Sequence, residues 1–231
     1  MAGAVLAPAS PGLVSALALT KHLDPKPKIT IFEVRDTPST IGGAVNLTPK
    51  ALRYLDYLGI DARGLSAECK TIELCDLYTG QKYAEVDFRG ADGTGVGKDA
   101  SKKFFSARVL RRELQAALLK AVKQRANVNV LWGKQVETID ERQAEDDVQL
   151  TFKDCEQTTC DLLLGCDGIH SATRTLLIEP ERQPTYTGIS VCMAMAKLRP
   201  DTYLRWETTA LVSSRQRSFM ASYFERSRTE Q

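Results

Sequence analysis

Hydrophobic positions near the N-terminus predict a strand, a helix and a second strand. Apolar residues fill 2–6, and after a turn rich in proline and alanine they recur at helical spacing to about His22. Residues 28–33 then form a dense β-branched run that ends in a carboxylate, Glu33, as is typical of a buried parallel strand. This order predicts a βαβ unit, and the expected fold class is α/β.

The next part of the chain predicts a helix and an antiparallel excursion from the α/β core. Thr48 is an N-cap residue and Pro49 stands at the first helical position, and this helix should end at Gly59. Residues 71–76 and 81–88 have the composition of two strands joined by a turn. We therefore expect a strand pair inserted after the opening βαβ unit.

A long helix and several strands follow a glycine-rich loop over 89–103. Apolar positions between 109 and 125 recur at helical spacing, and 128–132 predicts a return to the main sheet. Residues 136–139 and 148–152 bracket a polar turn and predict a hairpin. The remaining predicted strands are 160–165, 189–197 and 218–223.

Composition excludes several classes of protein. Hydrophobic residues make up 43% and charged residues 26%, as in ordinary folded chains. Lys plus Arg number 31 and Asp plus Glu 29, so the net charge of +2 is too small for nucleic acid or a membrane surface to be an expected partner. The uncharged start of the chain lacks a basic n-region, and no stretch reaches the roughly 18 apolar residues of a membrane span. We expect a cytoplasmic protein.

The cysteines and histidines offer little material for a metal site. The chain has 6 cysteines and 2 histidines, and no two cysteines form a C-x-x-C pair. Zinc sites combine such pairs with further cysteines or histidines at short spacing. We therefore expect reduced thiols and no metal ion.

Gly12 and Glu33 partly satisfy the pattern of a dinucleotide-binding loop. In a G-x-G-x-x-G loop the glycines let a pyrophosphate approach a helix N-terminus, and an acidic residue about 20 positions later accepts the ribose hydroxyls. Ala7 and Ala9 occupy the first two glycine positions here, and Glu33 lies 21 residues after Gly12. The alternative is a turn that only packs the βαβ unit.

A second candidate site is the turn that follows the strand predicted over 160–165. Asp167 and Gly168 form a tight turn, and Ser171 is placed to cap the helix expected next. A plain strand-to-helix turn is the alternative. The occurrence of the Asp167–Gly168 turn together with the βαβ unit and Arg111 favours a ligand site over this alternative.

Several segments together carry a family resemblance. Residues 165–174 have the form of the family motif G-A-D-G-x-x-S-x-x-R, and residues 7–19 resemble the family loop G-x-G-P-A-G-L. The sequence thus resembles the FAD-dependent aromatic-ring monooxygenases with the p-hydroxybenzoate hydroxylase fold, in particular fungal salicylate-hydroxylase-like enzymes. The matching segments are 7–19, 31–33, 41–52, 111–119 and 165–174.

The resemblance implies a domain organisation and an adenosine site. It implies a Rossmann-like FAD-binding domain over 1–180, with inserted strands at about 71–88, and a partial substrate-domain β-sheet over 181–231. It further implies that Glu33 holds the adenosine ribose and that Gly12 lies under the pyrophosphate.

The resemblance also implies the residues at the flavin end of the cofactor. Arg111 would reach the phosphate or ribityl region as a charged donor. Asp167 and Gly168 would shape the turn that meets FAD and the nicotinamide donor. The residues implied to line the flavin are Gly43, Ala44 and Asn46.

The implied function is hydroxylation of an aromatic or enolic small molecule with FAD, NADPH or NADH, and O2, in secondary metabolism. No catalytic side chain is assigned, because Cys192, Met193 and Ala194 stand where relatives carry an arginine. The family's later G-D-A-x-H-x-x-x-P motif is not found before Gln231, which implies a C-terminally truncated member. The alternatives are an inactive paralogue and a non-catalytic partner protein.

Overall fold

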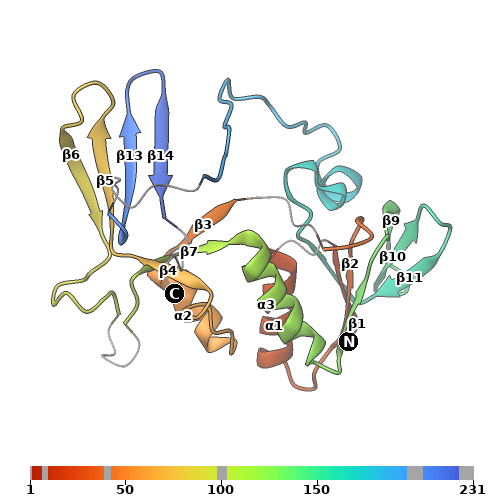
Figure 1. Ribbon diagram of the computed structural model, residues 1–231. Coiled ribbons are helices and arrows are strands. Elements are labelled where there is room, and N and C mark those ends of the chain that lie inside the picture. Colours follow the sequence, from red (N-terminus) through yellow and green to blue (C-terminus); the bar gives the residue numbers. More distant parts are fainter. Residues whose placement is uncertain (1, 7–9, 39–42, 98–102, 197–204, 224–231) are drawn as a thin grey trace. The chain divides into compact units, whose positions relative to one another are not determined.

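Two compact units make up the chain in the computed structural model (Figure 1). Unit 1 comprises residues 1–40 and 115–192, and unit 2 comprises residues 41–114 and 193–231. Each unit contains two of the β-sheets. The structure describes residues 2–6, 10–38, 43–97, 103–196 and 205–223.

A four-stranded parallel sheet with the strand order β12-β1-β2-β8 forms the centre of unit 1. Strand β1 (Ala2–Leu6) lies between β2 (Lys28–Phe32) and β12 (Leu162–Gly165). Strand β8 (Val128–Leu131) pairs with the other side of β2. Helix α1 (Ser10–His22) connects β1 to β2. The predicted α/β class and the opening βαβ unit are confirmed.

Helix α1 buries an apolar face of its own. Leu13, Ala16 and Leu17 are at most 2% exposed, and they recur at the helical spacing that the sequence predicted. In the neighbouring strand β2, Ile29 and Ile31 are at most 1% exposed. Burial of these side chains fixes the helix beside the strands that it connects.

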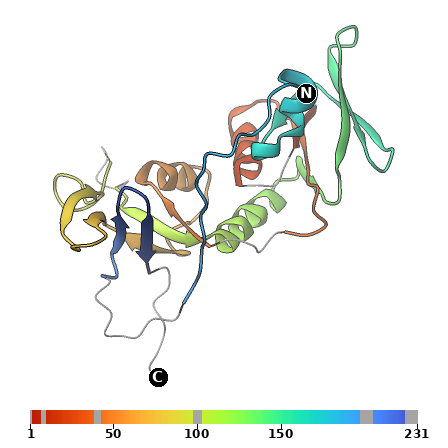
Figure 2. The same ribbon diagram turned by 90° about the horizontal axis from the view of Figure 1, so that it is seen from above.

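An antiparallel sheet of β9 (Val136–Arg142), β10 (Asp147–Phe152) and β11 (Gln157–Cys160) completes unit 1 (Figure 2). Its first two strands form the predicted hairpin. The Phe152 ring packs against Phe32, with 4.8 Å between the ring centroids. Together with Ile139, Leu150 and Cys160, these rings form a hydrophobic cluster that joins the two sheets of the unit.

The predicted continuous strand 160–165 is wrong in one respect. The chain leaves the sheet pairing at Asp161, so that β11 ends at Cys160 and β12 begins at Leu162. The two strands belong to different sheets. Apolar residues lie on both sides of this short break in the sequence, which is why the pattern alone predicted a single strand.

Unit 2 contains an antiparallel sheet with the order β3-β7-β4. Strand β7 (Ser106–Leu110) lies between β3 (Ala44–Leu47) and β4 (Ser66–Cys69), and all of its residues are buried. Helix α2 (Pro49–Tyr57) follows β3. Thr48 caps this helix as predicted, since its hydroxyl accepts the backbone N–H of Ala51 at 3.3 Å.

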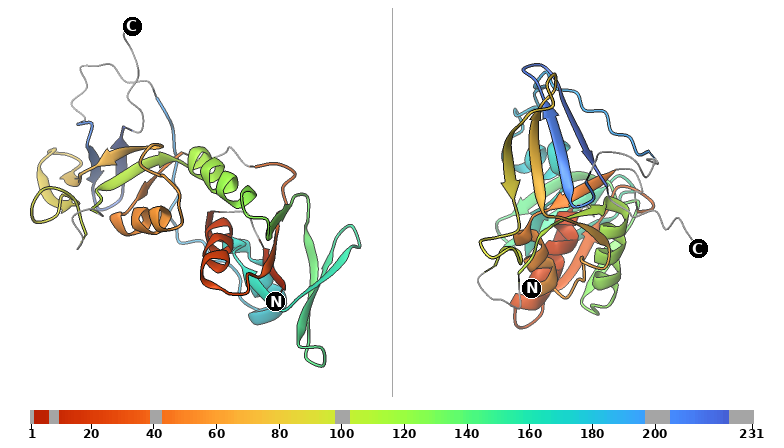
Figure 3. Two further views of the ribbon diagram at one scale, coloured as in Figure 1. Left: turned by 90° about the horizontal axis from the view of Figure 1, so that it is seen from below. Right: turned by 60° about the vertical axis from the view of Figure 1, so that its left-hand side comes forward.

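The second sheet of unit 2 has the order β14-β13-β5-β6 (Figure 3). Strand β5 (Thr71–Asp76) pairs antiparallel with β6 (Lys82–Asp87), as predicted, and parallel with β13 (Thr208–Ser213). Strand β14 (Ser218–Ser222) pairs antiparallel with β13. Strands from distant parts of the sequence thus share one sheet.

Helix α3 (Arg111–Lys123) is shorter than the helix predicted over 109–125. Val109 and Leu110 belong to β7, because their side chains are buried in the sheet that precedes the helix. The sequence pattern did not predict β3, β4, β7 or β13. Conversely, the strand predicted over 189–197 is wrong: residues 189–196 have no regular secondary structure, and residue 197 lies outside the described residues.

A buried arginine links the two sheets of unit 2. Arg108 in β7 is fully buried, and its Nη1 donates to the Thr208 carbonyl at 2.9 Å. Its Nη2 donates to the carbonyl of Glu68 at 3.1 Å and also to that of Trp206. Burial lowers the pKa of the guanidinium from its ordinary value. Backbone carbonyls of β4 and of the chain leading into β13 thus hold a buried positive charge.

We predict that Arg108→Ala lowers the free energy of unfolding by about 3 kcal/mol or more, because three backbone carbonyls lose their donor and a cavity is left. Urea unfolding followed by circular dichroism measures this. The matched control Arg53→Ala removes an exposed arginine from α2 and should change the value by less than about 0.5 kcal/mol. Equal effects of the two substitutions would contradict the proposed role of Arg108.

Candidate functional site

The carboxyl ends of three strands of unit 1 lie at the same edge of the parallel sheet. Strands β2 and β12 both pair with β1, and Leu6 at the end of β1 is in register with Phe32 and with Gly165. The carboxyl ends of the three strands therefore coincide. In open α/β sheets ligands bind at this edge, where neighbouring strands lead into different connections. The predicted residues Gly12, Glu33 and Asp167 follow these three strand ends.

Gly12 is buried in the first turn of α1. The first N–H groups of a helix have no partner within the helix and carry its positive dipole end. Gly12 is therefore placed where the sequence predicted an anion to lie. Ala7 and Ala9, which replace the first two glycines of the loop pattern, lie outside the described residues.

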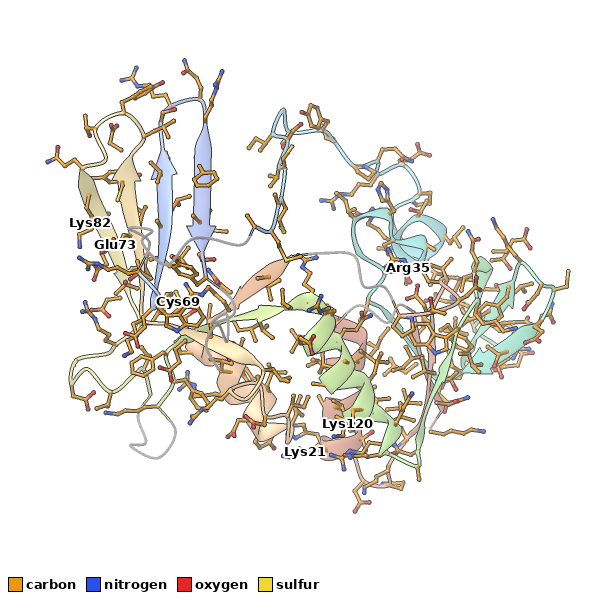
Figure 4. The ribbon with its side chains drawn as sticks, in the orientation of Figure 1. Lys21, Arg35, Cys69, Glu73, Lys82 and Lys120 are labelled. Carbon is orange, nitrogen blue, oxygen red and sulfur yellow. The ribbon has the colours of Figure 1, made fainter. Side chains whose placement is uncertain are left out.

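Glu33 is a buried carboxylate directly after β2. It is 4% exposed, and its Oε1 accepts the backbone N–H of Arg35 at 2.8 Å. Desolvation raises the pKa of Glu33 above its ordinary value, and this outweighs the opposing hydrogen bond from Arg35. Two backbone bonds fix its position: its N–H donates to the Leu131 carbonyl, and its carbonyl accepts the N–H of Lys134. Figure 4 labels Arg35 beside this strand end.

Asp167 organises the turn that follows β12. Its Oδ1 accepts the Ser171 hydroxyl at 2.6 Å, and its Oδ2 accepts both the N–H and the hydroxyl of Thr173, at 3.0 and 3.2 Å. Gly168 has a φ of +78°, which L residues rarely adopt. The predicted turn is therefore present, and both Asp167 oxygens shape it.

The helix predicted after this turn is short and irregular. A 3₁₀ turn spans Gly168–His170, and a single π turn spans Arg174–Ile178. Ser171 acts as a cap, since its hydroxyl oxygen accepts the N–H of Arg174 at 3.0 Å. Thr173 was not predicted as part of the site. The sequence signal that could have identified Thr173 is its position, a hydroxyl residue 6 positions after Asp167. At this spacing its backbone N–H can donate to the Asp167 carboxylate.

The other four predicted cofactor residues lie in unit 2. Ala44 and Asn46 belong to β3, where they pair with Leu110 and Arg108. The Gly43 carbonyl accepts the N–H of Arg111, the first residue of α3, at 3.2 Å. The Arg111 side chain is exposed. The structure thus brings the predicted residues together in two groups, one in each unit.

The space next to Gly43 holds a methionine side chain. A Cβ atom added to Gly43 would collide with the Met193 Sδ, so a larger residue here would require the Met193 side chain to move. Met193 itself is 63% exposed. The sulfur therefore covers one side of the backbone that the family resemblance implied would line a flavin.

The described part of the chain contains no group of three or more His, Cys, Asp or Glu residues that could hold a metal ion. None of the six cysteines, all of which lie in the described ranges, forms a disulfide bond. Within the same described ranges, none of the helices has the length and apolar character needed to cross a membrane.

Comparisons with known proteins show which family the chain resembles. A family model described as an FAD binding domain matches residues 9–225. Salicylate hydroxylase of Pseudomonas putida is 27% identical over 183 residues, covering 77% of this chain and 39% of that protein. The FAD-dependent monooxygenase pigN of Monascus ruber is 25% identical over 181 residues, covering 74% of this chain and 39% of that protein.

The fold is also similar to a solved structure, that of a substituted form of Klebsiella pneumoniae HpxO complexed with FAD. The TM-score is 0.73 at 19% sequence identity, and the match covers 98% of this chain and 55% of that chain. The chain spans 39% of the length of the two curated relatives described above. These findings confirm the family resemblance that the sequence motifs predicted.

We predict that Asp167→Ala lowers the free energy of unfolding by about 1–3 kcal/mol, because the Ser171 hydroxyl and the Thr173 N–H lose their acceptor. Chemical denaturation measures the change. Glu137→Ala, which removes an exposed carboxylate from β9, serves as the control and should have an effect below about 0.5 kcal/mol. An unchanged stability of Asp167→Ala would show that the turn does not depend on this carboxylate.

Proposed function

Because the chain belongs to the family of FAD-binding domains, we propose that it acts as an FAD-dependent monooxygenase that hydroxylates an aromatic or enolic small molecule with NADPH or NADH and O2. One observation carries the proposal: Gly12, Glu33 and the Asp167 turn converge at the carboxyl edge of the parallel sheet. The proposed setting is cytoplasmic secondary metabolism.

The adenosine end of FAD fits the residues of unit 1. An ionised carboxylate has about four lone-pair sites for hydrogen bonds. Glu33 accepts the Arg35 N–H at one oxygen, which leaves acceptor capacity for two ribose hydroxyls. The N-terminal turn of α1, with Gly12 buried in it, then offers backbone N–H groups to the pyrophosphate.

The flavin end is proposed to lie along the predicted residues of unit 2. Ala44 and Asn46 would face the ring system, and the exposed Arg111 guanidinium would donate to the phosphate or ribityl oxygens. The Met193 side chain would have to turn away from Gly43 if the flavin approaches that backbone. In the proposed complex, Asp167 and Gly168 set the shape of the turn rather than donating to the cofactor.

Residues 181–231 are proposed to begin a substrate domain, and residues 1–180 to form the FAD-binding domain. Since paired residues share a face of a sheet, Leu74 and Leu211 lie on the same side of the sheet, and Ile72 lies there too. The opposite side carries charges such as Glu73, which Figure 4 labels near Lys82. The apolar face suits an aromatic substrate, because it excludes water.

Bound FAD would supply the redox and oxygen chemistry. The residues of this chain would bind the cofactor, orient it and shield the substrate.

A direct test mixes the purified chain with FAD, NADPH or NADH and a panel of phenols, and measures flavin binding, nicotinamide oxidation and hydroxylated product. Product that requires FAD supports the proposal. Flavin binding without product favours the inactive paralogue, and absence of flavin binding contradicts the proposal.

We predict that Glu33→Ala weakens FAD binding by about tenfold, since the ribose loses a charged hydrogen-bond acceptor. Fluorescence titration of FAD measures the dissociation constant. Glu141→Ala removes an exposed carboxylate from β9 of the same unit and should leave the affinity unchanged. Equal affinities of both variants would remove Glu33 from the site.

FAD binding should also depend on pH through Glu33. Burial raises the pKa of this carboxyl above its ordinary value of 4.5, and the ribose hydroxyls bind its ionised form. The affinity should therefore fall as the pH is lowered towards the raised pKa, at a higher pH than for an ordinary glutamate. In Glu33→Gln the corresponding fall should be absent; a fall that persists in this variant would assign the dependence to another group.

Without FAD, the contribution of Glu33 to the free energy of unfolding should increase as the pH is lowered, whereas the affinity for FAD should decrease. A raised pKa means that the folded state favours the protonated carboxyl, so this stabilisation is complete below the ordinary value of 4.5 and is lost as the pH rises through the raised pKa. Thermal unfolding of the wild type and of Glu33→Gln across this range separates the two effects.

A further inference from the structure

Three side-chain atoms of Met193 lie over the backbone of Gly43. A Cβ atom added to Gly43 would collide with the Met193 Sδ, and it would lie 3.2 Å from the Cγ and 3.7 Å from the Cε of the same side chain. Gly43 is buried, so the methionine forms part of its cover. Both residues belong to unit 2, and the contact therefore lies within one unit.

The Gly43 side of this contact is fixed by backbone hydrogen bonds. The Gly43 carbonyl accepts the N–H of Arg111 at 3.2 Å, and the next residue, Ala44, pairs with Leu110 in β7. All residues of β7 are buried. A displacement of the Gly43 backbone would therefore disturb the sheet β3-β7-β4.

The Met193 side of the contact can move. Met193 lies in the range 189–196, which has no regular secondary structure. A methionine side chain is unbranched and has three rotatable bonds, so it can leave a contact by rotation alone. Of the two partners, the methionine side chain is thus the one that moves aside for a ligand.

The covered backbone lies at the proposed flavin end of the cofactor. The N–H that bonds to the Gly43 carbonyl belongs to Arg111, which is proposed to reach the phosphate or ribityl oxygens, and Ala44 is proposed to face the ring system. A glycine has no Cβ and lets a flat ring approach the backbone closely. The ring and the three Met193 atoms therefore require the same space over Gly43.

We propose that Met193 lowers the affinity for FAD, because its side chain covers the flavin position at Gly43 in the cofactor-free protein and leaves it when the flavin binds. This inference rests on the proposed function, since it takes Gly43 to line the flavin. When only a fraction of the molecules is competent to bind, the apparent dissociation constant is the intrinsic constant divided by that fraction. The cover affects only the flavin half of FAD, so ADP, which has no flavin, binds equally well with and without it.

Calorimetric titration of Met193→Ala with FAD and with ADP tests the proposal, because the shortened side chain no longer reaches over Gly43. We expect the dissociation constant for FAD to fall by about fourfold, which corresponds to the burial of one methylene group. The dissociation constant for ADP should not change. Met195→Ala is the matched control, since Met195 lies in the same segment at 57% exposure against 63% for Met193, and it should leave both constants unchanged.

Nuclear magnetic resonance of the protein without FAD tests the contact itself. The chain has 4 methionines, and after isotope labelling of their methyl groups the Met193 signal is the one that is lost in Met193→Ala. We expect a nuclear Overhauser effect between this methyl group and the α-protons of Gly43. The effect should disappear when FAD is added and persist when ADP is added.

The two measurements separate this proposal from the proposed function. An absent Overhauser effect in the free protein would overturn the proposal even where FAD binds, as would an FAD affinity that is unchanged or lower in Met193→Ala. Absence of FAD binding by both the wild type and Met193→Ala would refute the proposed function, and this proposal with it.

Discussion

The parallel pairing of β1 with both β2 and β12 is the constraint on which the candidate site depends. It brings three strand ends together at one edge, although β2 and β12 are separated by 129 residues of sequence between Phe32 and Leu162, both ends excluded. Residues that follow each strand end are therefore close in space without needing to be close in the chain. A slip of one residue in either pairing would move Glu33 or the Asp167 turn away from this edge and would reverse the faces of the strand.

The two acidic residues at this edge have different environments, and this difference supports different proposed roles. Asp167 uses both oxygens for local hydrogen bonds to Ser171 and Thr173, so its contribution is the shape of the turn. Glu33 is almost completely buried but accepts the N–H of Arg35 at one oxygen, and burial raises its pKa. A buried carboxylate with spare acceptor capacity is costly unless a ligand donates to it, which supports Glu33 as the ribose-binding residue.

The sequence predicted those elements whose signals are local. The βαβ unit, the Thr48 cap and the β9–β10 hairpin each depend on neighbouring residues, and each is present. Strand β13 was missed because its partner β5 lies more than 130 residues earlier. Conversely, a strand was predicted over 189–197 from alternating apolar residues, but the described residues 189–196 pair with no strand. The predicted cofactor residues are divided between two units, and this division depends on contacts between distant parts of the chain that no local motif encodes.

Hydrogen exchange of the backbone amides with and without ADP tests the central claim most directly. ADP carries the adenosine, ribose and pyrophosphate of FAD but no flavin, so it separates the two groups of predicted residues. The account predicts slower exchange in residues 10–14 and 33–36 of unit 1 with ADP, and no change in residues 43–47 of unit 2 until FAD is used instead. Protection of unit 2 alone by ADP, or no protection of unit 1 by either ligand, would contradict the account.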